Sequence, residues 1–344
     1  MTLDTISPAR RQSPARERRP RIGFLGAGWI GAHRMEAMLA AGQVEAVGIA
    51  DPAADRLDAV AALAPHAARA AGLEDLLALD LDGIVIATPS ALHAAQAIQA
   101  LERGVAVFCQ KPLGRTAAEA AAVVEAAHKA NRLLGVDLSY RHTAAMRRIR
   151  EVIQAGALGQ VFACDLVFHN AYGPDKPWFY DRELSGGGCV MDLGVHLADL
   201  ALWALDFPEV REVSSTLVAG GAPLKLQAGQ VEDYATATLQ LENGASVRLA
   251  CSWRLNAGCE AQISASFYGT RGGAEMRNVG GSFYDFAARL NRGTTAEILT
   301  EGPDAWGGRA AVEWARRLAA GQRFDPECRR LVQLSQVLDR VYGR

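Results

Sequence analysis

The stretch RIGFLGAGWIG occupies residues 21–31. Its first five residues predict a short apolar strand, and Gly26, Gly28 and Gly31 follow in the G-x-G-x-x-G spacing before a helical run. In that spacing the first glycine permits a tight turn, the second lets the backbone approach a pyrophosphate, and the third lets the helix lie close to the strand. The stretch therefore predicts a dinucleotide-binding turn, where the helix N-terminus presents N–H groups to phosphate oxygens.

A carboxylate follows at the spacing expected for a residue that holds the ribose hydroxyls. Asp51 comes about 20 residues after Gly31, at the end of a second apolar strand at 44–50. Asp51 could instead be the N-cap of the next helix, at 53–63, but the spacing favours the ribose role. No arginine or serine directly follows Asp51 to receive a 2′-phosphate. NAD is therefore favoured over NADP, although Arg56 keeps NADP open.

Composition narrows the classes of partner. The chain has 344 residues, enough for two domains, with 50% hydrophobic residues and a formal net charge of −2. Nothing in this balance calls for nucleic acid or a membrane surface. The six cysteines include no C-x-x-C pair, so neither a metal site nor a disulfide framework is expected, and a cytoplasmic location fits best. Residues 1–20 are rich in Arg, Pro and Ser, which predicts a disordered lead without a secretory signal.

The βα pattern continues to residue 142, which predicts a doubly wound parallel sheet over 21–142. Further buried strands are expected at 81–87, 105–109 and 133–136, with helices at 91–103 and 116–130. Ligands of such sheets bind at the carboxyl ends of the strands. Candidate cofactor-binding residues therefore follow two of these strands. Thr88, Pro89 and His93 come after the strand at 81–87, and Gln110 and Lys111 come after the strand at 105–109. Trp29 and Ile30, at the helix start after the glycine turn, are further candidates. His93 could equally be held by local backbone, and Lys111 could equally be a solvated loop lysine.

Residues 143–344 have a different character, which predicts an α+β domain with a large, mostly antiparallel, open-faced sheet. Alternating strands are expected from residue 160 and at 210–218, 233–241, 245–255 and 261–268, with a hairpin at Asn243-Gly244 and closing helices at 310–320 and 328–341. The open face could meet a second subunit or be wet. No run approaches the length of a membrane-spanning helix.

A second group of chemical residues lies in GGGCVMDLGVH, residues 186–196. Asp192 and His196 are four residues apart, so a helix would place both on one face. A carboxylate one turn from an imidazole can orient it and stabilise its protonated form, as a general base requires. A buried structural network is the alternative, but two polar residues in an apolar helix favour a functional role.

With these motifs in order, the chain resembles the Gfo/Idh/MocA oxidoreductases, such as inositol dehydrogenase and glucose-fructose oxidoreductase. The resemblance implies a Rossmann domain, a substrate domain whose sheet forms a homodimer or homotetramer, and hydride exchange between NAD(P) and a secondary hydroxyl or ketone of a sugar, sugar derivative or cyclitol. It also implies that Lys111, Asp192 and His196 are the catalytic residues. The family's Lys-Pro bond, which corresponds to Lys111–Pro112, is often cis. Gln110 replaces the family's glutamate, which removes a charge.

These residues suggest a mechanism in which His196 takes the hydroxyl proton, Lys111 holds the same oxygen and Asp192 supports the imidazolium. Candidates for the substrate wall are Tyr140, Arg141, His169, Trp178 and Tyr180, each equally suited to a core or surface position. Two rival functions remain open: an NAD-dependent glycosidase that oxidises a ring carbon transiently, and a non-catalytic dinucleotide-binding regulator.

Overall fold

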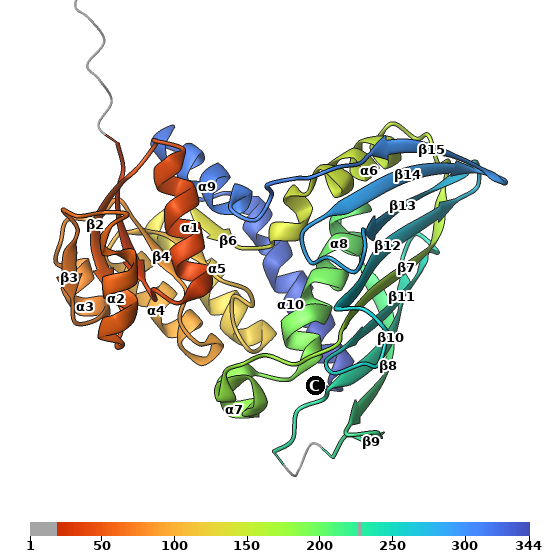
Figure 1. Ribbon diagram of the computed structural model, residues 1–344, viewed down its shortest axis with the longest axis horizontal. Coiled ribbons are helices and arrows are strands. Elements are labelled where there is room, and N and C mark those ends of the chain that lie inside the picture. Colours follow the sequence, from red (N-terminus) through yellow and green to blue (C-terminus); the bar gives the residue numbers. More distant parts are fainter. Residues whose placement is uncertain (1–18, 226–228) are drawn as a thin grey trace, which may run out of the picture.

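The computed structural model describes residues 19–225 and 229–344. The two expected domains lie side by side, with the parallel sheet on the left of Figure 1 and the larger sheet on the right. Residues 1–18 of the expected disordered lead are outside the described residues. Among the residues described, no helix is both long and apolar enough to span a bilayer.

The first domain is a six-stranded parallel sheet in the order β3-β2-β1-β4-β5-β6, so the strand order reverses between β1 and β4. Its strands are β1 Arg21–Leu25, β2 Glu45–Ala50, β3 Ala68–Ala70, β4 Gly83–Ile86, β5 Ala106–Cys109 and β6 Leu134–Val136. Its helices are α1 Trp29–Ala40, α2 Ala54–Ala61, α3 Leu73–Leu77, α4 Ser90–Glu102 and α5 Ala117–Ala130. The reversal opens a crevice at the carboxyl ends of β1 and β4, where ligands of such sheets bind.

Local sequence explains most of these elements. β4 and β5 are buried along their whole length, as their apolar runs predict. Helix α5 begins where Thr116 accepts a hydrogen bond from the Glu119 backbone N–H and ends at Asn131, which has the left-handed conformation. β3 and α3 were not predicted. They are only three and five residues long, and two of the three β3 residues are exposed.

The second domain is a nine-stranded sheet in the order β15-β14-β13-β12-β7-β11-β10-β8-β9. The pair β7 and β11 is parallel, and the other pairs are antiparallel. The strands are β7 Val161–Asn170, β8 Val210–Ala219, β9 Ala222–Pro223, β10 Tyr234–Leu241, β11 Ser246–Ser252, β12 Ala261–Gly269, β13 Gly272–Asn278, β14 Phe286–Arg292 and β15 Thr295–Thr300. Asn243 and Gly244 lie in the hairpin between β10 and β11, and Gly244 has φ +85°, which explains the glycine.

Helices cover one face of this sheet and leave the other open (Figure 1). The covering helices are α6 Ala144–Gln154, α8 Val195–Ala204 and α10 Arg329–Val341. In β7 the side chains of Cys164, Leu166 and Phe168 belong to the core under these helices. The alternate residues, including Asp165 and His169, therefore point to the open face.

The C-terminal helices tie the two domains together. Helix α9, Arg309–Ala319, packs on α1, and its Trp314 lies in the core of the first domain against Phe108. Helix α10 contacts α5 of the first domain and α8 of the second. Helix α10 therefore contacts both domains, and α9 places a C-terminal helix in the core of the first.

Candidate active site

A cleft of about 1410 Å³ runs between the domains. The glycine turn and Asp51 line one part of it, and Lys111, Asp192 and His196 line another. One continuous cavity thus contains the residues that the two separate motifs predicted.

The glycine turn has the shape that a phosphate requires. Gly26 has φ +96°, and a Cβ on Gly31 would overlap the carbonyl oxygen of Gly26, so neither position accepts a side chain. A Cβ on Gly28 would instead meet two cations, with Lys176 Nζ at 3.7 Å and Arg56 Nη1 at 3.9 Å. A backbone that can be approached closely, beside two positive charges, fits the diphosphate of a dinucleotide.

Asp51 ties the end of β2 to this turn. Its Oδ2 accepts a hydrogen bond from the Ala27 N–H at 2.8 Å, and its Oδ1 accepts one from the Ala53 N–H at 2.9 Å. The N-cap position of α2 belongs to Ala53, so Asp51 is not the cap of that helix. A carboxylate has about four acceptor sites. Asp51 therefore keeps capacity for ribose hydroxyls while it holds the turn in place.

The His93 side chain links two backbone segments at the edge of the parallel sheet. The buried ring contacts the carbonyl oxygen of Pro112 at 2.7 Å and that of Thr88 at 2.8 Å, and burial lowers its pKa. It thus joins the ends of β4 and β5 beside the cis Lys111–Pro112 bond. Thr88, Pro89, Trp29 and Ile30 also line the cleft.

The contacts of Asp192 correct one expectation. Lys111 Nζ donates to the backbone oxygen and to Oδ1 of Asp192, both at 2.7 Å, and Trp253 Nε1 donates to Oδ2 at 3.0 Å. Residues Val190–Gly194 form a π-helical turn, η3, so positions four apart are no longer stacked as in an α-helix. Asp192 therefore orients Lys111, and the expected Asp192–His196 pair is wrong.

His196 is buried, lines the cleft and packs on Tyr140 with ring centroids 4.8 Å apart. Its Nδ1 has no hydrogen-bond partner among the described residues. Burial first, then the charges of Lys111 and Arg34, hold its pKa well below the usual value. The imidazole is therefore neutral near pH 7 and can accept a proton.

The neighbourhood of Gln110 contains two residues that sequence reasoning missed. Asp137 Oδ2 accepts hydrogen bonds from Gln110 Nε2 and from Arg34 Nε, each at 2.6 Å, and all three side chains are buried. The negative charge that Gln110 lacks is therefore supplied by Asp137, from the next strand end. The sequence did contain a signal for Asp137, because it directly follows β6 at a strand end, just as Lys111 comes shortly after β5.

Glu232 is a further residue that sequence reasoning missed. Its Oε1 accepts hydrogen bonds from the backbone N–H groups of Gly188 and Val190, at 3.0 and 2.9 Å, and from the hydroxyl of Tyr342 at 2.7 Å. Burial raises the pKa of this carboxyl. Glu232 thus anchors the entry to the π-helical turn. No local pattern marks it, because its partners are far away in the sequence.

The substrate wall is more aromatic than expected. Tyr140 and Trp178 line the cleft as predicted, and Trp178 stacks on Phe179 with centroids 3.8 Å apart. Further aromatic residues that line the cleft were not predicted: Phe168, Phe179, Phe283, Tyr284 and Trp306.

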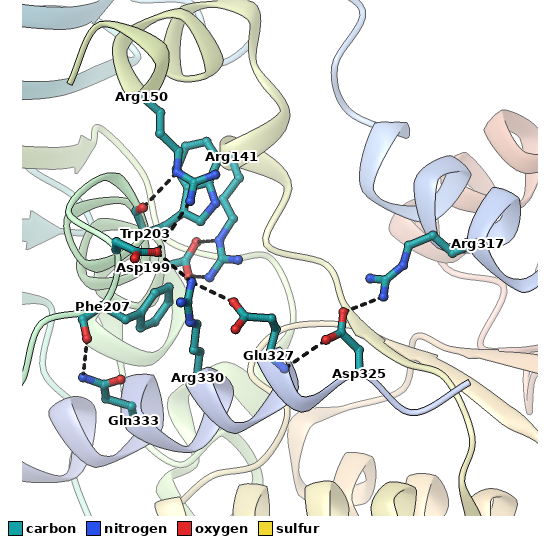
Figure 2. Close-up of polar contacts among 11 residues, drawn as sticks. Arg141, Arg150, Asp199, Trp203, Phe207, Arg317, Asp325, Glu327, Arg330 and Gln333 are labelled. Carbon is teal, nitrogen blue, oxygen red and sulfur yellow. Dashed lines mark hydrogen bonds and ion pairs between the residues drawn. The ribbon is translucent and has the colours of Figure 1, made fainter. Parts of the chain in front are cut away.

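Arg141, His169 and Tyr180 do not line the cleft. Arg141 forms a two-pronged ion pair with the buried Asp199, and Figure 2 shows this pair among other charged residues of α6 and α10. His169 is on the open face of β7, where it contacts Ser252 Oγ at 2.7 Å. Tyr180 donates its hydroxyl to Pro174 O at 2.9 Å. The prediction that Arg141 and His169 line the substrate wall is therefore not supported. A position after a strand or within one does not tell from sequence which direction the side chain points.

Two family models match the chain, one for each domain. Residues 20–138 match the oxidoreductase family with the NAD-binding Rossmann fold, and residues 146–275 match the GFO/IDH/MocA C-terminal domain. The chain belongs to the Gfo/Idh/MocA family. The fold class expected from sequence is confirmed by solved structures of this architecture.

Two curated relatives are similar in sequence to parts of this chain. D-glucoside 3-dehydrogenase of Escherichia coli (strain K12) is 28% identical over 223 residues, which are 62% of this chain and 61% of that protein. Levoglucosan dehydrogenase of Pseudarthrobacter phenanthrenivorans is 33% identical over 150 residues, 39% of this chain and 37% of that one. The chain thus spans less than two thirds of the length of either.

Among solved structures, a levoglucosan dehydrogenase in complex with NADH and L-sorbose superimposes with a TM-score of 0.79 at 20% identity. The superposition covers 94% of this chain and 96% of the other. GenD2 from gentamicin A biosynthesis, in complex with NAD, gives a TM-score of 0.78 at 23% identity and covers 98% of this chain and 97% of that one. At such identities the likeness establishes the fold of this family member.

Proposed function

We propose that this family member is an NAD(P)-dependent oxidoreductase that acts on a secondary hydroxyl or ketone of a sugar, sugar derivative or cyclitol. One observation carries the proposal. Lys111 from the first domain and His196 from the second line one cleft that begins at a glycine turn fitted to a dinucleotide. When bound there, the nicotinamide supplies the hydride acceptor or donor. Gly26, Gly28, Gly31 and Asp51 would hold the coenzyme.

The side chains have complementary tasks. In the oxidation direction, neutral His196 accepts the proton of the substrate hydroxyl. Two of the three ammonium hydrogens of Lys111 go to Asp192, which leaves the third for the substrate oxygen. Asp192 fixes the direction of that hydrogen, so it acts by orienting Lys111.

The lining favours an uncharged ring. Three cations that line the cleft away from the glycine turn are each paired with a carboxylate: Lys111 with Asp192, Arg34 with Asp137 and Arg309 with Asp304. A phosphate or carboxylate on the substrate would have to break one of these pairs. The aromatic rings suit the CH faces of a sugar. The names of the D-glucoside and levoglucosan dehydrogenases agree with such a substrate.

Several finer proposals follow from the same residues. NAD is the preferred coenzyme, because Asp51 would repel a 2′-phosphate. The six free cysteines support a reducing, cytoplasmic compartment. We also expect a homodimer or homotetramer through the open face of the sheet, where Tyr268 is 41% exposed. Light scattering after size-exclusion chromatography measures this assembly directly.

The test is a substrate screen with NAD⁺ and NADP⁺ against cyclitols, free sugars, glycosides and their phosphorylated or acidic counterparts. We expect NADH to accumulate with a neutral sugar or cyclitol. Cleavage of a glycoside without net NADH would favour the glycosidase function instead. Coenzyme binding without turnover of any substrate would favour the regulator, which has no need of Lys111 or His196.

A further inference from the structure

Lys176 is a cation of the second domain that reaches the coenzyme half of the cleft. It lies in the segment between β7 and α7 (Arg182–Ser185), and α7 contacts α4 of the first domain (Figure 1). Lys176 is half-buried and lines the cleft. Lys111 and Lys129 have carboxylate partners within 4 Å, whereas Lys176 forms no ion pair with any residue that the structure describes.

The position of its ammonium indicates a ligand. Nζ lies 3.7 Å from the point that a Cβ on Gly28 would occupy, and Arg56 Nη1 lies 3.9 Å from the same point. The carboxylate nearest to Arg56 is Asp51, 3.8 Å away, and its oxygens already accept two backbone hydrogen bonds. Two positively charged side chains therefore lie beside the point at which a diphosphate would approach the backbone of Gly28.

We infer that Lys176 contacts the diphosphate of the bound dinucleotide, so that the substrate domain itself supplies a coenzyme ligand. The inference rests on the proposed function, because it requires the glycine turn to hold NAD(P). Gly28 is the position at which the backbone approaches the pyrophosphate, and a lysine beside it adds a charge-assisted hydrogen bond.

This contact has a consequence for the substrate wall. Trp178 and Phe179 follow Lys176 within three residues and line the cleft. Once the ammonium is held by the diphosphate, the backbone that carries both rings is held as well. We therefore expect the bound coenzyme to order this part of the substrate wall.

The experiment compares Lys176→Ala, Lys176→Arg and the control Lys129→Ala, whose side chain is 75% exposed. Dissociation constants for NADH and NADPH are measured by fluorescence titration without any sugar. For Lys176→Ala we expect both to rise roughly tenfold, the effect of one charged hydrogen bond. Lys176→Arg retains most of the affinity, and the control is unchanged. Hydrogen exchange at 171–185 slows on addition of NADH to the wild type, but much less in Lys176→Ala.

Two results would overturn the inference: NADH affinity of Lys176→Ala within twofold of the wild type, or a loss confined to NADPH, which would assign Lys176 to the 2′-phosphate. The binding measurement is independent of turnover. A wild type that binds NADH and oxidises no sugar contradicts the proposed function alone. A wild type that oxidises sugar while Lys176→Ala binds NADH normally contradicts the Lys176 contact alone.

Discussion

Lys111 Nζ donates a 2.7 Å hydrogen bond to Asp192 Oδ1, which joins the end of β5 in one domain to the π-helical turn in the other. A second bond from the same ammonium goes to the backbone oxygen of Asp192. The two proposed catalytic elements are therefore fixed to each other through groups that also face the substrate. Relative movement of the domains would disturb the proposed site at its centre.

Replacement of Lys111 by Met should reduce kcat at least 100-fold, because the substrate oxygen loses its hydrogen-bond donor. Asp192→Asn should cost less, about tenfold, because the backbone oxygen and the amide oxygen still accept from Lys111. Both are measured by steady-state kinetics alongside NADH titrations, with Lys129→Ala as the matched control. Unchanged kcat in Lys111→Met would remove Lys111 from the reaction.

His196 should set the acid limb of the pH profile for oxidation. Its pKa lies well below the usual 6.5, so the imidazole remains an acceptor down to pH values below 6.5 and is lost only on further acidification. The value of kcat/KM should thus stay level from pH 8 to below pH 6.5 and fall only on further acidification. His196→Gln should lower kcat at least 100-fold and leave NADH affinity within threefold. An acid limb that persists in this variant would have to come from another group.

Gln110→Glu should destabilise the protein by about 2 kcal/mol, because a second carboxylate would replace the amide that donates to Asp137. The double variant Gln110→Glu, Asp137→Asn exchanges the two groups and should recover most of the loss. Urea unfolding of the wild type, both single variants and the double variant gives the coupling free energy. Additive effects would mean that the two side chains do not interact.

Arg141→Ala should lower stability by about 3 kcal/mol, because it leaves the buried Asp199 without its partner. Activity per folded molecule should be retained, since Arg141 lies outside the cleft (Figure 2). Arg148→Ala, on an exposed part of α6, is the control and should change stability by less than about 0.5 kcal/mol. A specific loss of substrate affinity in Arg141→Ala would restore its predicted place in the substrate wall.

The sequence was informative where short-range rules act. The glycine spacing, the buried strand runs and the Asn243-Gly244 hairpin are local patterns, and the structure contains all three. β3 was too short and too exposed to produce such a pattern.

The site was only partly predictable, because its contacts depend on long-range packing. Lys111, Asp192 and His196 line one cleft, but Asp192 contacts Lys111 where the sequence suggested His196 as its partner. Asp137 and Glu232 acquire their roles only through residues on other strands and helices. His169 was a candidate for the substrate wall but lies outside the cleft, because alternation in β7 does not reveal which face is covered.

The Tyr342–Glu232 hydrogen bond spans 110 positions of the chain. A ribosome must therefore translate α10 in full before the carboxylate that anchors the π-helical turn has its phenolic partner. The glycine turn and its Asp51 contact need only residues that precede Pro52, whereas the anchor of the π-helical turn needs a residue made almost 300 positions later.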